Sequence, residues 1–449
     1  MPVSIRRDVS YLMGAQAVST FGSFITRAAL PLLAIIGLQI SAAEAALLAA
    51  VDLFAAALVS QFAGVWIDRL PRRPVLIGAD LVRAAALGSI PVAAALFGGV
   101  TLAHLIVISA AGGMCTTAFD IAERSYLAGL VPAPHLRVVL GRLLGIRGAA
   151  EFFGFGSAGI LIGTIGGPAA IGVDAATYLL SAALIAGLRV REPRLPTARR
   201  RRNFLSEARE GAAQTWAIPI LRPLLGTSAA IGLYFGLFRS SYMIYVARTL
   251  ELPAEAIGFV IATGGIASFS GGLLTERISR RLGTGRAISV SLVIVGLGLA
   301  LVPLAPAASA AGIGLLVLHQ LLSDGFETVW EANQGAIRGR VLPDAVQGRA
   351  NAAFEGISIV GRLAGIALGG ALGSSVAGSG AALMFGAAAS IGAGLGIAAT
   401  RLGRVARRLQ ELDHRQGDRA DEHRRAGAVP HATWRRGHRR RADVHRVRR

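Results

Sequence analysis

Acidic side chains within an otherwise apolar stretch are the first candidates for chemistry in this sequence. Asp324, Glu327 and Glu331 fall in the apolar run 309–333. If this run is helical, their spacing of i, i+3 and i+7 places all three on one face of the helix. A carboxyl group that is held away from water can take up and release a proton, because desolvation disfavours its charged form. The spacing therefore favours a strip of protonatable groups.

Five further charged residues interrupt apolar runs, namely Arg27, Asp52, Asp120, Glu123 and Arg239. Asp120 and Glu123 are spaced i and i+3, and Asp52 falls midway through its run. A charge in an apolar span is costly, so such residues are functional candidates by default. Asp174 also lies in an apolar run, where a role in helix packing or capping is as good an interpretation as proton coupling.

A ten-residue sequence occurs twice, half a chain apart. The two copies are Gly64-Val-Trp-Ile-Asp68-Arg69-Leu-Pro-Arg72-Arg73 and Gly272-Leu-Leu-Thr-Glu276-Arg277-Ile-Ser-Arg280-Arg281. Each copy follows an apolar run and precedes another. The glycines allow helices to approach closely, and the acids could face the N-terminus of a neighbouring helix. We predict a gating role: contacts that form when one end of the molecule is closed and break when it opens.

The elements that must position these residues are long apolar segments. The chain has 449 residues, of which 53% are hydrophobic and 16% charged. A bilayer-spanning helix needs about 20 apolar residues. Twelve runs qualify, near 10–31, 43–66, 74–97, 101–125, 139–163, 168–188, 222–247, 256–276, 286–306, 309–333, 347–372 and 378–400.

These runs predict an all-α membrane protein with twelve transmembrane helices in two pseudo-symmetric halves. The expected division is an N-terminal half (1–188), an arginine-rich linker (189–221), a C-terminal half (222–400) and a disordered basic tail (401–449). The connections between the runs alternate between arginine-rich and nearly uncharged. Because arginine-rich loops stay in the cytoplasm, both termini and the linker are expected on that side of the inner membrane.

Several other functions are disfavoured by the sequence. The net charge is +20, but the arginines lie between apolar runs and in the tail, and nothing resembles a nucleic-acid-binding motif. The lone Cys115 excludes intrachain disulfides and a cysteine-based metal cluster, and the histidines of the tail are irregularly spaced. A phosphate-binding loop and a nucleophile elbow are both missing. We therefore expect no enzyme activity, metal or cofactor, which leaves proton-motive coupling.

The repeated ten-residue sequence resembles the G-x-x-x-D-R-x-x-R-R motif of the major facilitator superfamily. Further segments are similar to its bacterial drug, macrolide and siderophore exporter branch: Phe119-Asp120, Leu130-Val-Pro132, Asp174-Ala-Ala-Thr-Tyr-Leu-Leu-Ser181-Ala182 and Pro343-Asp344-Ala-Val-Gln-Gly348-Arg349-Ala-Asn351-Ala352. The chain departs from that pattern at Ser23, where the branch often has aspartate, and at Ser157, where its antiporter motif has proline.

The resemblance implies a central cavity lined by the first, fourth, seventh and tenth spans, and so by Arg27, Arg239 and the acidic residues of the fourth and tenth spans. It also implies alternating access and a proton-coupled exporter of small molecules. The alternatives are an importer or lipid transporter of the same fold, and a membrane scaffold or sensor that transports nothing. The expected partners are a small-molecule substrate, protons and membrane lipid, with the chain acting as a monomer.

Overall fold

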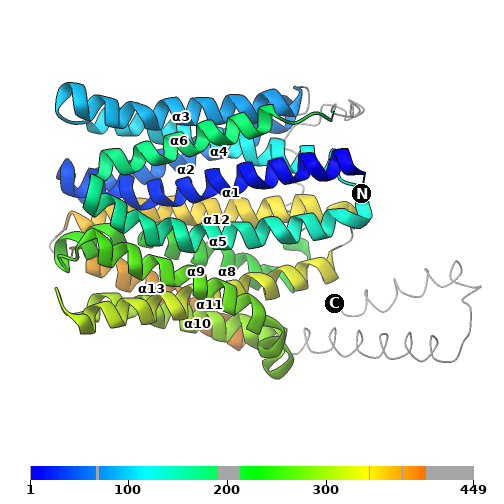
Figure 1. The fold of residues 1–449 in the computed structure, drawn as a ribbon. Coiled ribbons are helices and arrows are strands. Elements are labelled where there is room, and N and C mark those ends of the chain that lie inside the picture. Colours follow the sequence, from blue (N-terminus) through cyan, green and yellow to red (C-terminus); the bar gives the residue numbers. More distant parts are fainter. Residues whose placement is uncertain are drawn as a thin grey trace, which may run out of the picture.

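The computed structural model describes residues 2–66, 70–190, 213, 215–342, 344–375 and 378–400. Within these ranges the chain is helical and contains no β-strand. The long helices are α1 (Val3–Leu32), α2 (Ala42–Trp66), α3 (Arg72–Phe97), α4 (Leu102–Leu130), α5 (Ala133–Ile165), α6 (Gly167–Ala186), α8 (Leu221–Ile244), α9 (Ala254–Leu282), α10 (Thr284–Ala300), α11 (Ala310–Val341), α12 (Asp344–Gly373) and α13 (Gly378–Ala399). They run alongside one another as a single bundle (Figure 1).

Each predicted span falls on one of these helices, and several helices are longer than predicted. For example, α1 begins at Val3 instead of residue 10, and α11 continues to Val341 instead of residue 333. The added turns contain arginines, so an apolar criterion ends the span too early.

Eleven of the described helices are long and apolar enough to cross a membrane. The exception, α11, contains His319, Gln320, Asp324 and Glu327, which lower its mean hydropathy. It packs against α9 and α10, so much of its polar surface is covered by protein.

The helices form two sets with the same packing pattern. In the first set α1 packs on α5 and α6, α3 packs on α4 and α6, and α2 packs on α4. In the second set α8 packs on α12 and α13, α10 packs on α11 and α13, and α9 packs on α11. Each contact in one set has its counterpart in the other, as expected for a duplicated six-helix unit. We call the sets α1–α6 and α8–α13 the N-half and the C-half.

The repeat extends to an irregular stretch of backbone. Helix α1 ends in a π-helical turn, η1 (Leu33–Gly37), and α8 ends in a matching turn, η3 (Tyr245–Thr249). Each turn is followed by a residue with positive φ, Gln39 at 54° and Glu251 at 52°. Isolated π-turns occur most often at functional sites. Here they shape the chain where it leaves the first helix of each half.

The two halves meet near one end of the bundle, which carries the connections 38–41, 98–101, 250–253 and 305–309. We call it the neutral end, and we call the opposite end, which carries the start of α1 and the α2–α3 connection, the basic end. The Arg248 guanidinium of η3 donates a 2.7 Å hydrogen bond to the Ile35 carbonyl of η1. Close helix approaches between the halves, α5 on α9 and α2 on α12, lie in the parts of these helices nearest the neutral end. In this conformation the halves are therefore closed together at the neutral end.

Candidate functional site

Charged side chains from both halves meet about ten residues below the neutral end. The Arg239 guanidinium of α8 forms an ion pair with the Asp52 carboxylate of α2. The two side chains are 57% and 33% exposed to water. Arg27 of α1 is also exposed, although its charged neighbours Asp52, Arg147 and Arg239 come from three other helices. Because these groups are exposed although protein surrounds them, they line a solvent-accessible space between the halves.

The acids of α11 lie along the same space, farther from the neutral end. Asp324 and Glu327 are partly buried and Glu331 is exposed. Asp324 packs against α9, because a Cβ on Gly264 would lie 2.0 Å from Asp324 Oδ2. Within the described residues neither Asp324 nor Glu327 forms an ion pair. Arg239, the charged residue of α8, pairs with Asp52 and not with these acids.

Residues of two further helices join this charged region and were not singled out from the sequence. Glu151 of α5 is a charged neighbour of both Asp324 and Arg27, and Arg147 lies one turn away on the same helix. Arg362 of α12 is near Glu327 and also lies 3.6 Å from Glu355. The sequence could have indicated Arg147 and Glu151, because they are charged residues four positions apart in a long apolar run.

The predicted pair in the fourth span lies apart from the acids of α11. Asp120 is partly buried and Glu123 is only 7% exposed. The charged groups nearest Glu123 are Asp120, Arg147, Arg124 and Asp80. Glu123 therefore faces the interior of the N-half, and it also interacts electrostatically with Arg147, which lies at the central space.

The two copies of the predicted gating motif differ in their surroundings. In the first copy Gly64 falls within α2, while Asp68 and Arg69 lie outside the described residues. Arg72 is buried at the start of α3, and the Arg73 guanidinium donates to the carbonyl oxygen of Ala186 at the end of α6.

The second copy lies on α9, and its glycine, acid and arginines are exposed, namely Gly272, Glu276, Arg277, Arg280 and Arg281. The Glu276 carboxylate lies 3.7 Å from the Arg280 guanidinium on the same helix. An exposed pair of this kind contributes little to stability. Ser279, within the same copy, donates a 2.8 Å hydrogen bond to Asn333 on α11. The gating role of the motif stays a prediction.

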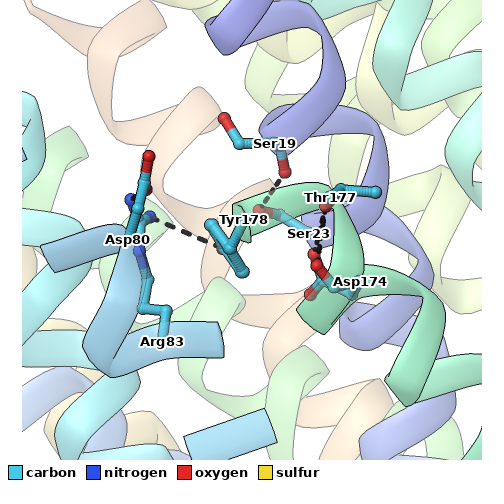
Figure 2. Close-up of polar contacts among 7 residues, drawn as sticks. All are labelled: Ser19, Ser23, Asp80, Arg83, Asp174, Thr177 and Tyr178. Carbon is cyan, nitrogen blue, oxygen red and sulfur yellow. Dashed lines mark hydrogen bonds and ion pairs between the residues drawn. The ribbon is translucent and has the colours of Figure 1, made fainter. Parts of the chain in front are cut away.

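A second polar cluster is buried inside the N-half (Figure 2). On α3, the Arg83 guanidinium forms an ion pair with Asp80 one turn earlier; their side chains are 7% and 0% exposed. The guanidinium also lies over two aromatic rings, 4.2 Å from the ring centre of Tyr178 on α6 and 4.7 Å from that of Phe119 on α4. A buried charge needs such partners, because desolvation is expensive. Asp80 and Arg83 were not singled out from the sequence, although their i, i+3 spacing in an apolar run is a usable signal.

The cluster continues from α6 to α1. The Tyr178 hydroxyl lies 2.6 Å from the Ser23 hydroxyl, which donates to the Ser19 carbonyl oxygen at 2.7 Å. Asp174 is fully buried and packs against α1 so closely that a Cβ on Gly22 would lie 2.3 Å from Asp174 Oδ1. One short chain of polar contacts thus joins three helices of the N-half, and its member Ser23 lies one turn before Arg27 on α1.

Comparisons with known proteins agree on a family. The family model of the Major Facilitator Superfamily matches residues 12–330. An uncharacterized MFS-type transporter of Mycobacterium tuberculosis is 24% identical over 58% of this chain and 59% of its own length. The multidrug efflux pump Tap of Mycolicibacterium fortuitum is 27% identical over 57% of this chain and 64% of its own length. These alignments therefore span about three fifths of the relatives.

Solved structures give the same fold over a larger part of the chain. The nucleoside transporter NupG superposes with a TM-score of 0.69 and 13% identity, covering 87% of this chain and 98% of its own. A bacterial homologue of the iron transporter ferroportin in an inward-facing state gives a TM-score of 0.68 and 16% identity, covering 88% and 100%. With its duplicated six-helix halves, its charged central space and a family match over most of its length, this chain belongs to the Major Facilitator Superfamily of membrane transporters.

Proposed function

We propose that this transporter is a proton-coupled exporter of small molecules. The observation that carries the proposal is the set of acids along the space between the halves. Asp324 and Glu327 have no ion-pair partner within the described residues, and Glu151 adds a third carboxyl from the other half. Carboxyl groups that are not held in an ion pair attract cationic groups and protons alike, so the two can compete for them.

The geometry supports alternating access. The halves close together at the neutral end, while charged groups below the closure remain accessible to water. A substrate that entered from the basic end would meet Glu331 first, then Glu327 and Asp324, and then the Arg239–Asp52 pair that bridges the halves. Breaking that bridge would allow the neutral end to open. A half-exposed ion pair suits this role, because it contributes little net stability and can separate readily.

The efflux direction is supported by the likeness to the pump Tap. If the basic end faces the cytoplasm, as the arginine-rich connections predict, the conformation seen here is open to the compartment from which an exporter loads. Export would then exchange an internal cationic substrate for an external proton.

The direct test compares growth of a deletion strain and an overexpressing strain across a panel of toxic cations and neutral compounds. An exporter should increase tolerance to at least one cationic compound when overexpressed. Inverted membrane vesicles should then accumulate that compound when a proton gradient is imposed, and lose it when a protonophore is added. Accumulation in right-side-out vesicles under an inward proton gradient would show import and overturn the proposal.

A further inference from the structure

The polar cluster inside the N-half contains more carboxyl groups than cations. Asp80 and Asp174 are both fully buried, and Arg83, itself buried, is the only cation that contacts either of them among the described residues. Asp80 takes the ion pair with Arg83. A second buried carboxylate with no cation of its own would be expensive to keep charged.

The contacts of Asp174 indicate how that cost is avoided. The Thr177 hydroxyl donates mainly to the Asp174 backbone carbonyl at 2.7 Å and only weakly to Oδ1, at 3.1 Å. Oδ2 is buried and has no hydrogen-bond partner in the described part of the chain. The hydroxyl of Thr26 on α1 lies beside this carboxyl and is equally unsatisfied. The Thr26 hydroxyl could donate to an ionised Oδ2 or accept from a protonated one, but it carries no charge. A proton on Oδ2 is therefore what would remove the cost of burying a carboxylate that no cation contacts.

We propose that Asp174 is a proton-binding site of this transporter, separate from the acids of the central space, and that it holds its proton in the conformation seen here. The inference rests on the proposed proton coupling and assigns part of it to the buried cluster. The aspartic acid is the proton carrier, and Asp80 and Arg83 form a fixed pair beside it.

The helices around Asp174 contribute charged or titratable groups to its surroundings. The α3 groups are Asp80 and Arg83, and α6 itself contributes Tyr178. From α1 comes Arg27, a more distant cation that faces Glu151 on α5 and Asp52 on α2. Helix α4 contributes Glu123, which neighbours Asp80. The near surroundings therefore contain one cation already engaged, which favours a neutral Asp174.

Loss of the proton would change the position of α1. A charged Asp174 would draw on Arg83, which Asp80 already holds, or would admit water. Because Asp174 contacts α1 directly at Gly22, either change alters the packing of α6 on α1. Helix α1 carries Arg27 into the central space one turn beyond Ser23, and its π-turn η1 accepts the Arg248 hydrogen bond that closes the neutral end. Deprotonation of Asp174 is thus expected to favour opening of the neutral end.

The test measures opening without any substrate. Spin labels are placed on Gly99→Cys and Ala307→Cys, two exposed loop positions at the neutral end of opposite halves, in a Cys115→Ala background. The distance between the labels is measured by double electron–electron resonance in lipid nanodiscs, from mildly acidic to mildly alkaline pH. With Asp174 intact, the distance should lengthen as pH rises. Asp174→Asn, which resembles the protonated acid in shape, should keep the short distance at every pH.

The matched control is His104→Gln, which removes a titratable side chain of the same half, one that contacts Ser89 on α3 and belongs to neither the buried cluster nor the central space. This variant should leave the pH-dependent lengthening intact. A lengthening in Asp174→Asn equal to that of the parent would overturn the proposal. If Asp174→Asn does not fold, Asp174→Glu keeps a titratable group at a new position. Its lengthening should occur with a displaced midpoint, and an unchanged midpoint counts against the proposal.

A spectroscopic measurement tests the protonation directly. Infrared spectra of the purified protein at mildly acidic pH should contain the carbonyl band of a buried protonated carboxyl, and Asp174→Asn should lose this intensity. Identical bands in the two proteins would show that Asp174 is not the carrier. These outcomes are independent of export: a failed compound panel would remove the exporter function, while the label distances would still report a proton-linked opening.

Discussion

At the scale of single residues, the structure separates two kinds of charge within the bundle. Arg27, Asp52 and Arg239 are accessible to water and can rearrange at modest cost. Asp80 and Arg83 are enclosed, and each depends on the other for compensation. The same residue types therefore serve different purposes, and exposure distinguishes movable charges from fixed ones.

We predict that Asp324→Asn abolishes proton-driven accumulation in inverted vesicles while downhill exchange of substrate persists. The amide keeps the size of the acid and much of its hydrogen bonding but cannot bind and release a proton. Asp324→Glu should retain part of the driven transport. Uptake of an identified substrate, with and without a protonophore, provides the measurement, and full driven transport by Asp324→Asn would exclude Asp324 as a coupling residue.

The Asp80–Arg83 pair should respond to substitution as a fixed structural pair. Removing one partner of a buried pair leaves an uncompensated charge, at a cost of about 3–5 kcal/mol. Asp80→Asn or Arg83→Gln alone should therefore sharply lower the apparent melting temperature in detergent, and the double substitution should recover much of the loss. Arg277→Gln on the exposed part of α9 is the control, with little expected change. A double variant no more stable than the worse single variant would contradict this account.

At the scale of elements, small residues set how closely the two halves can approach. A Cβ on Gly159 of α5 would lie 2.6 Å from the carbonyl oxygen of Ala254 at the start of α9. On the α2–α12 contact, a Cβ on Gly370 would lie 2.7 Å from the Cβ of Ala46. Close approach of this kind is how transmembrane helices pack without a hydrophobic driving force between them.

Gly159→Ala should destabilise closure of the neutral end, because the added methyl group meets backbone that cannot move aside without separating α5 from α9. The control is Gly156→Ala on the same helix, where the new Cβ would lie 3.7 Å from the Ala262 side chain, an ordinary contact. The Gly99–Ala307 label distance should shift to longer values in Gly159→Ala and stay unchanged in Gly156→Ala. Equal distances in both variants would show that this contact does not control closure.

Most elements of the fold could be predicted from the sequence, because a bilayer requires long apolar runs and the runs are easily counted. The sequence could not predict the partners of the charged residues, because these depend on which helix faces which. Arg239 pairs with Asp52 across 187 positions of the chain, a contact that spacing along one helix cannot reveal. The Asp80–Arg83 pair is different, because its i, i+3 spacing is visible in the sequence, but its burial inside one half depends on how α3 packs against α4 and α6.

At the scale of the whole molecule, the halves share a packing pattern but not a distribution of buried charge. The N-half encloses the Asp80–Arg83 pair and Asp174. In the C-half the corresponding interior holds His319, fully buried, with its Nδ1 3.0 Å from the Ser323 hydroxyl and its ring 5.7 Å from the ring centres of Phe238 and Tyr242. The duplicated fold thus encloses charged groups in one half and a histidine packed among aromatic rings in the other.

The orientation of the molecule in the membrane decides what the closed neutral end means for transport. Because arginine-rich connections remain in the cytoplasm, we predict that the basic end faces inward and that the structure is open toward the cytoplasm. Single cysteines at Ala198 in the linker and at Gly166 in the α5–α6 connection, each in a Cys115→Ala background, should react oppositely with a membrane-impermeant thiol reagent. In intact cells only the cysteine at position 166 should be labelled, and permeabilisation should expose the one at position 198. Labelling of position 198 from outside would reverse the orientation, and the same closed conformation would then describe a molecule loading from the exterior.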